Sequence, residues 1–513
     1  MADWLSKEFL KLFGDVVDDV SWLSHLASSK VINTAVDSTR HRPHPWSTFK
    51  DYTSWQGLTD RSYLARHLPA VDPPPNLPAA TAVQQLFARP AGAQTLSKKS
   101  TCLFPAFAQY LTDGFIRTDP ANPGKTTSNH EIDLCPLYGR TPAQTGILRK
   151  NSNVPAERGR LKSQTINGEE FAPFLYINTG TAIDPPFEDL DHPLLGQDAP
   201  LPARLATLFA FGGDRANSTP FTAMMNTLLL REHNRIAGEL QKQNPTWDDD
   251  RVFHTARNIL IPIYIKIVIE QYINHITPLP FHLVADPSVA WTAAWNRPNW
   301  MTVEFSLLYR WHSLMPDQIN WPGQPIPLKI FGLNNTPLLN VGLDAAFSAA
   351  AAQPAAELGA LNTGAALLSI EERAVLQARA NRIGPYNSYR QAFGMNPAKT
   401  FDDITTRPAV AAMLKQLYGT PDKVEFYAGL FAEDHVPNSP LPGLLLRMVA
   451  VDAFSQALTN PLLSEHVFNA TTFTPWGFDL IHNTGSLGDL LARNVPKPGG
   501  HPIIMTQSNW QSQ

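Results

Sequence analysis

The chain has 513 residues, of which 43% are hydrophobic and 10% aromatic, so it can bury a large core. Its net charge of -4 and the lack of any basic run argue against a nucleic-acid-binding protein. Two cysteines, Cys102 and Cys135, cannot build a disulfide framework or a cysteine-based metal site. This favours a reducing compartment, and we expect a cytoplasmic protein.

The N-terminal segment, residues 1–40, is predicted to form an amphipathic helix. Apolar residues recur there at steps of three and four, namely Leu5, Phe9, Leu12, Val16, Val20 and Leu23. One interpretation is a helix docked on its own protein, and the other is a peripheral membrane anchor. Asp15, Asp18 and Asp19 would be repelled by anionic lipid and count against the anchor.

The next elements in chain order are mostly helical. Residues 69–90 are rich in Pro and Ala and predict an extended connection. Residues 220–243 and 248–276 each predict a long helix, the second with a kink at Pro262. The Ala-rich stretch 344–368 predicts short helical turns at the surface. We see no run of alternating strands and no apolar run of the roughly 20 residues that a bilayer span needs, so the predicted fold class is mainly α.

Isolated polar residues stand on several of these apolar helices. Gln109 and Asp113 are four apart in "FAQYLTDG" and project from one helix face. Arg215 lies in the Gly-rich turn "GGDRANSTP", and His312 lies in "EFSLLYRWHSLMPD". One imidazole and several distal polar groups are the set that a haem and a peroxide require. Each of them taken alone is equally typical of a satisfied core residue, and "REHN" (231–234) of structural salt bridges.

In these motifs the chain resembles the animal-type haem peroxidase superfamily, and within it the cyclooxygenase and fatty-acid dioxygenase branch. The match runs in order through "SWQGLTDRSYLARHLPAV", "FAQYLTDGFIRTD", "HEIDLCPLYGR", "LLLREHNRIAGEL" and "EFSLLYRWHSLMPD" to "GFDLIHNTGSLGDLL". About 450 residues are covered. The resemblance implies one large helical haem domain over residues 41–513, binding haem b without a covalent link.

The resemblance also implies roles for individual residues. His312 is expected to be the proximal haem ligand, and Tyr309 the tyrosine that becomes a radical and takes hydrogen from the substrate. We expect the two to lie on one helix, three residues apart and facing the same way, with Trp311 as a packing or electronic neighbour. The other implied positions are Tyr272 as hydrogen-bond partner of Tyr309, Phe305, Leu308 and Ser455 in the substrate channel, and Gln109 as the distal glutamine.

Several positions depart from the family pattern. Asp113 stands where the family has its distal histidine, and Arg215 falls where the peroxidases of the family keep a catalytic arginine. Ser218 and Thr219 cannot form the ester links of the myeloperoxidase type. The tyrosine that helps to bind the substrate carboxylate in cyclooxygenases is Leu279 here. Arg40 and Arg42 are the candidates for its arginine partner.

Three functions remain open from the sequence. The first is an oxygenase that adds O2 to an unsaturated fatty acid or similar lipid through a Tyr309 radical. The second is a peroxidase that uses Asp113 and Arg215 to oxidise small donors, and the third is a haem-binding protein without turnover. The expected partners are a lipid substrate, O2 and a peroxide; the oligomeric state is left open, with a homodimer as one option.

Overall fold

Helices dominate the computed structural model, which describes residues 17–37, 44–195, 201–496 and 498–512. The α-helices are α2 (Ser21–Asp37), α3 (Trp55–Thr59), α4 (Ala80–Gln84), α5 (Leu103–Asp113), α6 (Cys135–Tyr138), α7 (Pro142–Leu148), α8 (Pro202–Leu205), α9 (Pro220–Gln243), α10 (Asp249–Ile267), α11 (Asn274–Ile276), α12 (Ser288–Trp291), α13 (Phe305–Leu308), α14 (Leu328–Phe331), α15 (Thr336–Ala352), α16 (Leu368–Ala380), α17 (Tyr386–Ala392), α18 (Pro408–Tyr418), α19 (Phe426–Ala432), α20 (Gly443–Leu458), α21 (Ala470–Phe473), α22 (Pro475–His482) and α23 (Leu487–Asn494). The predicted fold class is confirmed.

Shorter elements complete the chain. A π-helix, η3 (Val268–Ile273), continues α10, and the 3-10 turns are η1 (Pro155–Glu157), η2 (Pro185–Phe187), η4 (His312–Leu314), η5 (Phe401–Asp403), η6 (Pro421–Lys423) and η7 (Pro461–Leu463). Antiparallel strand pairs are β1 (Trp46–Ser47) with β2 (Ala65–Arg66), β3 (Leu96–Thr101) with β8 (Pro354–Ala356), β4 (Gln164–Ile166) with β5 (Glu169–Phe171), and β6 (Gln318–Trp321) with β7 (Gln324–Pro327). Pairs this short fix loops locally and form no layer of the fold.

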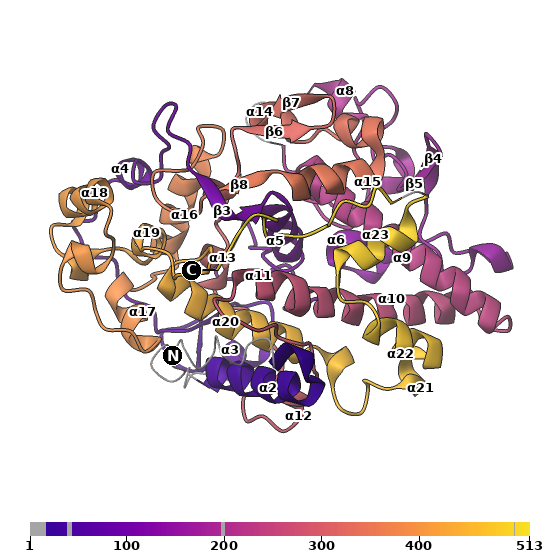
Figure 1. Cartoon of the computed structure of the whole chain (residues 1–513), viewed down its shortest axis with the longest axis horizontal. Helices are drawn as coiled ribbons and strands as arrows, with labels where there is room; N and C mark the ends of the chain where they lie inside the picture. The colour runs from indigo at the N-terminus through magenta and orange to yellow at the C-terminus, as the bar shows by residue number, and fades with distance from the viewer. Residues whose placement is uncertain (1–16, 38–43, 196–200, 497, 513) are drawn as a thin grey trace.

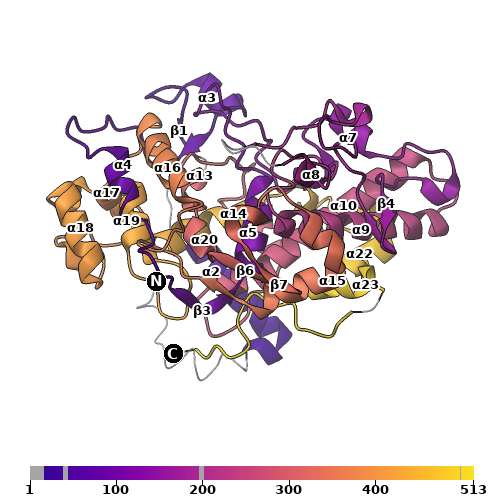
Figure 2. The ribbon, with the colours of Figure 1, turned by 90° about the horizontal axis from the view of Figure 1, so that it is seen from above.

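The two longest helices, α9 and α10, lie side by side, and α5, α15 and α23 pack against α9 (Figure 1). In α9 the Thr219 hydroxyl accepts from the Thr222 N–H while the Thr222 hydroxyl accepts from the Thr219 N–H, which forms a capping box before Pro220. Pro262 lies inside α10 as predicted, and the helix passes through it into η3. Seen from above, α3 and β1 lie together at one edge of the molecule (Figure 2).

Two expectations about apolar stretches are wrong. The stretch Asp249–Ile276 is long and apolar enough to cross a bilayer, but 72% of its most apolar window is buried in the protein, as in a core helix. The Ala-rich stretch does not lie at the surface, since Ala346 and Ala350 in α15 and Ala355 in β8 are fully buried. Alanine allows close approach of neighbouring backbones, so a low-complexity stretch can pack in a core.

The N-terminal segment is described from residue 17 onwards, and α2 packs on α12 and α20 of its own chain. Ile32 is fully buried, and Asn33 accepts a hydrogen bond of 2.8 Å from the indole of Trp295. Trp22, in the first turn of α2, is 65% exposed. The predicted positions before residue 17 lie outside the described residues, as do Arg40 and Arg42.

Candidate active site

Asp113 is the last residue of α5, and its carboxylate is almost fully buried. One oxygen, Oδ1, lies 3.7 Å from Nη1 of Arg215, while Oδ2 has no hydrogen-bond partner. Burial raises the pKa of Asp113 to about 7, and the charge of Arg215 offsets only part of that rise. Gln109 lies one turn earlier on the same helix, as the four-residue spacing predicted.

Arg215 is held by the turn that precedes α9. Its Nη1 donates 3.0 Å to the carbonyl of Ile116, just after α5, and its side chain remains 30% exposed. Ser218 donates 2.8 Å to the Arg215 carbonyl and so stabilises the turn. The structure therefore brings Asp113 and Arg215 together, although they are far apart in sequence.

Tyr309 and His312 do not share a helix, so this part of the prediction is wrong. Helix α13 ends at Leu308, and His312 begins the separate turn η4. The buried indole N–H of Trp311 donates 2.7 Å to the carbonyl of Leu308. If the helix continued, the Leu308 carbonyl would accept a hydrogen bond from the backbone amide of His312. The indole of Trp311 takes this acceptor instead, and the helix ends.

This turn stacks the ring of Tyr309 on Trp311, with centroids 4.7 Å apart and planes 25° apart. Residues two apart on a helix would not face each other, so the stack depends on the break. The ring of Trp311 also stacks with that of Tyr272 in η3, with centroids 6.4 Å apart. Trp311 thus contacts both tyrosines.

The hydroxyls of Tyr309 and Tyr272 are both buried and lack a hydrogen-bond partner of normal geometry. Burial raises the pKa of both phenols. For Tyr309, the interaction with the Tyr272 hydroxyl offsets part of this increase. The two hydroxyls therefore influence each other without a well-formed bond between them.

The residues predicted for the substrate channel differ in their surroundings. Phe305 and Leu308 on α13 are fully buried, and the Phe305 ring lies 4.6 Å from that of Tyr309. Ser455 on α20 is also fully buried, but its hydroxyl donates 2.7 Å to the Val451 carbonyl of its own helix. The Ser455 hydroxyl therefore already has a hydrogen-bond acceptor within its own helix.

His312 has a carboxylate partner that the sequence did not reveal. Its Nδ1 lies 3.3 Å from Oε1 of Glu371, a residue of α16 that is 1% exposed. Glu371 also accepts from Thr363 at 2.9 Å and from Tyr427 at 2.5 Å. It follows an Ala- and Leu-rich stretch with no motif, so no signal in the sequence points to it.

The "REHN" residues are structural, as the simpler interpretation held. His233 is fully buried, and its two ring nitrogens bond the Tyr138 hydroxyl and the Gly159 carbonyl, each at 2.8 Å. Burial lowers the pKa of His233 to about 3, so the ring is neutral. Arg231 pairs with Glu169 at 2.8 Å.

The residues present fit the haem that the resemblance implies. Nε2 of His312 makes no hydrogen bond with any described residue, while Nδ1 is held, which leaves the nitrogen that a haem iron needs. Arg310 forms no ion pair in the described part of the chain, and its buried Nε lacks a partner, which suits an anionic group such as a propionate. Asp113 offers its unpaired Oδ2.

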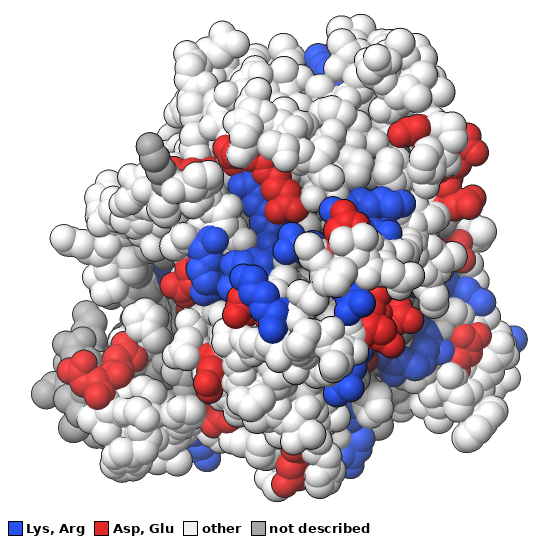
Figure 3. Space-filling model, turned by 90° about the vertical axis from the view of Figure 1, so that its right-hand side faces the viewer, with Lys and Arg blue, Asp and Glu red and all other residues white. Residues whose placement is uncertain are grey.

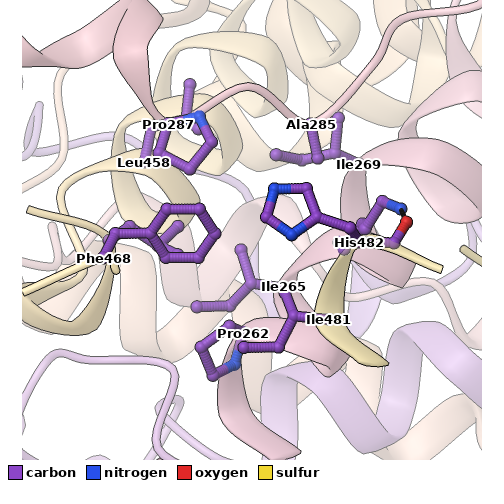
Figure 4. Close-up of a pocket in the computed structure, with 11 residues that line it drawn as sticks. Pro262, Ile265, Ile269, Ala285, Pro287, Leu458, Phe468, Ile481 and His482 are labelled. Atoms are coloured by element: carbon purple, nitrogen blue, oxygen red, sulfur yellow. Dashed lines mark hydrogen bonds between the residues drawn. The ribbon is translucent and has the colours of Figure 1, made fainter. Parts of the chain in front are cut away.

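A separate cavity lies between α10, η3, α20 and α22 (Figure 4). It holds about 40 Å³, and the rings of Phe468 and His482 face it from opposite sides. No residue that we predicted for the substrate channel lines it. Its small volume and distinct lining separate it from the Tyr309 site.

Charge on the molecular surface is mixed. On the face at the α9–α10 end, Lys and Arg side chains lie among Asp and Glu (Figure 3). Ion pairs are frequent, such as those of Arg149 with Asp249 and Asp250, each at 2.6 Å. A uniformly basic stripe of the kind that binds nucleic acid is not seen on this face.

Comparison with known proteins gives a consistent result. The family model described as "Animal haem peroxidase" matches residues 115–502. Prostaglandin G/H synthase 1 of Mus musculus is 31% identical over 472 residues, which cover 88% of this chain and 74% of that protein. Prostaglandin G/H synthase 2 of Gallus gallus is 30% identical over 94% of this chain and 78% of its own length.

Solved structures share the fold. Peroxidase A from Dictyostelium discoideum superposes with a TM-score of 0.71 at 18% identity, covering 91% of this chain and all of that chain. A fatty acid alpha-dioxygenase from Arabidopsis thaliana gives a TM-score of 0.68 at 15% identity, covering 95% and 90%. With the family match over most of its length, the chain belongs to the animal haem peroxidase family and is an oxidoreductase of that family.

Proposed function

We propose that the protein is a haem-dependent oxygenase that adds O2 to an unsaturated fatty acid or similar lipid through a radical on Tyr309. The observation that carries the proposal is the buried phenol of Tyr309, stacked on Trp311 at 4.7 Å and three residues before His312. Prostaglandin G/H synthases are about 30% identical to this chain. A rice fatty acid alpha-dioxygenase with palmitic acid shares the fold at a TM-score of 0.66, 14% identity and 96% coverage of both chains.

A haem held by His312 would supply the oxidising equivalent, and Tyr309 would lose one electron together with its phenolic proton to become a neutral phenoxyl radical. The phenoxyl radical takes a hydrogen atom from a C–H bond of the lipid and becomes a phenol again. O2 adds to the carbon radical, and the resulting peroxyl takes the phenolic hydrogen of Tyr309. The product is a lipid hydroperoxide, and the tyrosyl radical is regenerated.

The surroundings of Tyr309 suit this cycle. Phe305 and Leu308 exclude water from the phenol, and burial raises the pKa of Tyr309, so the neutral phenol rather than the phenolate is present between turnovers. Tyr272 and Trp311 pack around the ring and hold its orientation. Each of these side chains acts by positioning or by excluding water.

The experiment that tests this proposal is freeze-quench EPR of haem-loaded protein mixed with a fatty-acid hydroperoxide. We expect a tyrosyl radical in the wild type and in Tyr52→Phe, a control at a tyrosine that is 64% exposed. In Tyr309→Phe the signal should disappear together with O2 uptake. Full O2 uptake by Tyr309→Phe would contradict the oxygenase.

A peroxidase with Asp113 and Arg215 is the second candidate function. The specific observation in its favour is the carboxylate of Asp113, whose pKa of about 7 suits an acid–base catalyst near neutral pH. This function predicts that oxidation of small phenolic donors survives in Tyr309→Phe. Loss of donor oxidation in that variant would exclude it.

A further inference from the structure

We propose that Glu371 is the positioning residue of the proximal site. It holds the Nδ1–H of His312, so that Nε2 points to the haem iron and the ring becomes a more electron-rich ligand. This inference rests on the proposed role of His312 as the axial ligand.

Glu371 is built into the core rather than placed at the surface. It lies in the first turn of α16 and is 1% exposed. Oε1 lies 3.3 Å from Nδ1 of His312 and accepts from Thr363 at 2.9 Å, and Oε2 accepts from Tyr427 at 2.5 Å. Both oxygens are occupied, so the carboxylate has a fixed orientation.

The buried carboxylate of Glu371 has several hydrogen-bond partners but few partners that can carry positive charge. Within the described residues it lies 3.3 Å from Nδ1 of His312 and pairs with no lysine or arginine. A buried carboxylate is stabilised by a partner that can share a proton or carry positive charge. The N–H of His312 is the partner that best supplies this, since the two hydroxyls are neutral donors.

A hydrogen bond of this kind has a defined effect on a metal-ligating histidine. It selects the tautomer with the proton on Nδ1, fixes the ring plane and increases electron donation through Nε2. Stronger donation favours the more oxidised iron and so lowers the reduction potential of the haem. Glu371 would therefore tune the iron that His312 would hold.

Two measurements on Glu371→Gln test this inference. In the haem-free protein, 15N–1H spectra of labelled histidine should lose the single Nδ1–H tautomer of His312. In the haem-loaded protein, the reduction potential should rise and the iron–histidine stretching band should move to lower frequency. Haem affinity should fall on the order of 10-fold. Wild-type values in both measurements would overturn the inference.

The neighbouring residue offers a matched control. Glu372 makes no hydrogen bond with the described residues, so Glu372→Gln should leave tautomer and potential unchanged. Tyr427→Phe is a second variant in case Glu371→Gln does not fold. It removes a competing donor, so Glu371 should bind the imidazole more strongly and the potential should fall. A rise in Tyr427→Phe would contradict the inference.

His312→Ala separates this inference from the proposed ligand. We expect it to lose the iron–histidine band and to regain it with added imidazole. If the band persists without imidazole, His312 is not the ligand, and the role of Glu371 fails with it. If His312→Ala loses the band while Glu371→Gln matches the wild type, the ligand assignment stands and only the role of Glu371 is overturned.

Discussion

At the scale of single residues, Asp113 is the residue on which the proposed peroxide chemistry depends, because it stands where the family pattern has a histidine. An exposed aspartate has a pKa of about 4 and is a weak base near neutral pH. Burial raises the pKa of Asp113 to about 7, and Oδ2 is left without a partner. In the proposed peroxidase reaction this carboxylate would take a proton from the peroxide and return it.

The rate of reaction with hydroperoxide should therefore depend on Asp113 and on pH. As a base it acts when ionised, so the second-order rate should rise as pH increases through about 7. Asp113→Asn should lose this rise and fall by about 100-fold or more at pH 8. Stopped-flow absorbance measures both. The exposed Asp189→Asn is the control, and a wild-type pH profile in Asp113→Asn would contradict the role.

The sequence located Asp113, Arg215 and Gln109 but did not determine how the first two interact. The substitution at the histidine position was visible from the motif, and the i, i+4 spacing placed Gln109 on the same helix. The pKa of the carboxylate depends on the surrounding packing and on an arginine about 100 residues away. No local pattern encodes that distance.

At the scale of elements, the long helices follow from local signals and the tyrosine turn does not. The start of α9 was predicted from Pro220, and the capping box of Thr219 and Thr222 explains why the helix begins there. The end of α13 depends on the indole of Trp311 taking the carbonyl of Leu308. Hydrophobic periodicity does not predict a side chain that takes a backbone hydrogen-bond acceptor and so ends a helix.

The cap of α9 gives a stability prediction. Thr219→Ala removes the acceptor for the Thr222 amide, so the free energy of unfolding should fall by about 1 kcal/mol. Urea denaturation followed by circular dichroism measures the change. Thr219→Ser keeps the hydroxyl and should remain within a few tenths of the wild type. An equal loss in both variants would mean that packing of the methyl group, not the cap, is responsible.

At the scale of the whole molecule, Glu232 connects α9 to the C-terminal helix α23. Its carboxylate is fully buried and accepts from Arg235 at 2.8 Å, Arg493 at 2.9 Å and Asn494 at 2.7 Å. Burial alone would raise the pKa of Glu232, but these bonds and charges outweigh it and hold the pKa below its usual value. The ionised form is therefore the one that stabilises the fold.

Removing this charge should destabilise the protein. Glu232→Gln leaves Arg235 and Arg493 without their counter-charge, so the free energy of unfolding should fall by about 3–5 kcal/mol at pH 7. A lowered carboxylate pKa contributes stability above the unfolded value near 4.5 that is lost as pH falls through the folded value. The wild type should therefore lose more stability than the variant on acidification below about pH 4.5.

Urea titrations at pH 7 and below pH 4.5 measure both effects. Glu239→Gln on the same helix is the control, because Glu239 pairs with the exposed Lys242 and should cost less than about 1 kcal/mol. Equal losses in the two variants at pH 7 would show that the buried network contributes no more than a surface pair.

The sequence by itself determined the helical class, the two long central helices and the family, because each has a local pattern or an ordered set of motifs. From the same motifs it predicts Asp113 and His312 as the distal and proximal residues. The tertiary structure decided which side chains meet. It brought Arg215 to Asp113, stacked Trp311 on Tyr309 and on Tyr272, and placed Glu371 beside His312. These contacts join distant segments or break a helix, and their energies depend on burial, which sequence spacing does not encode.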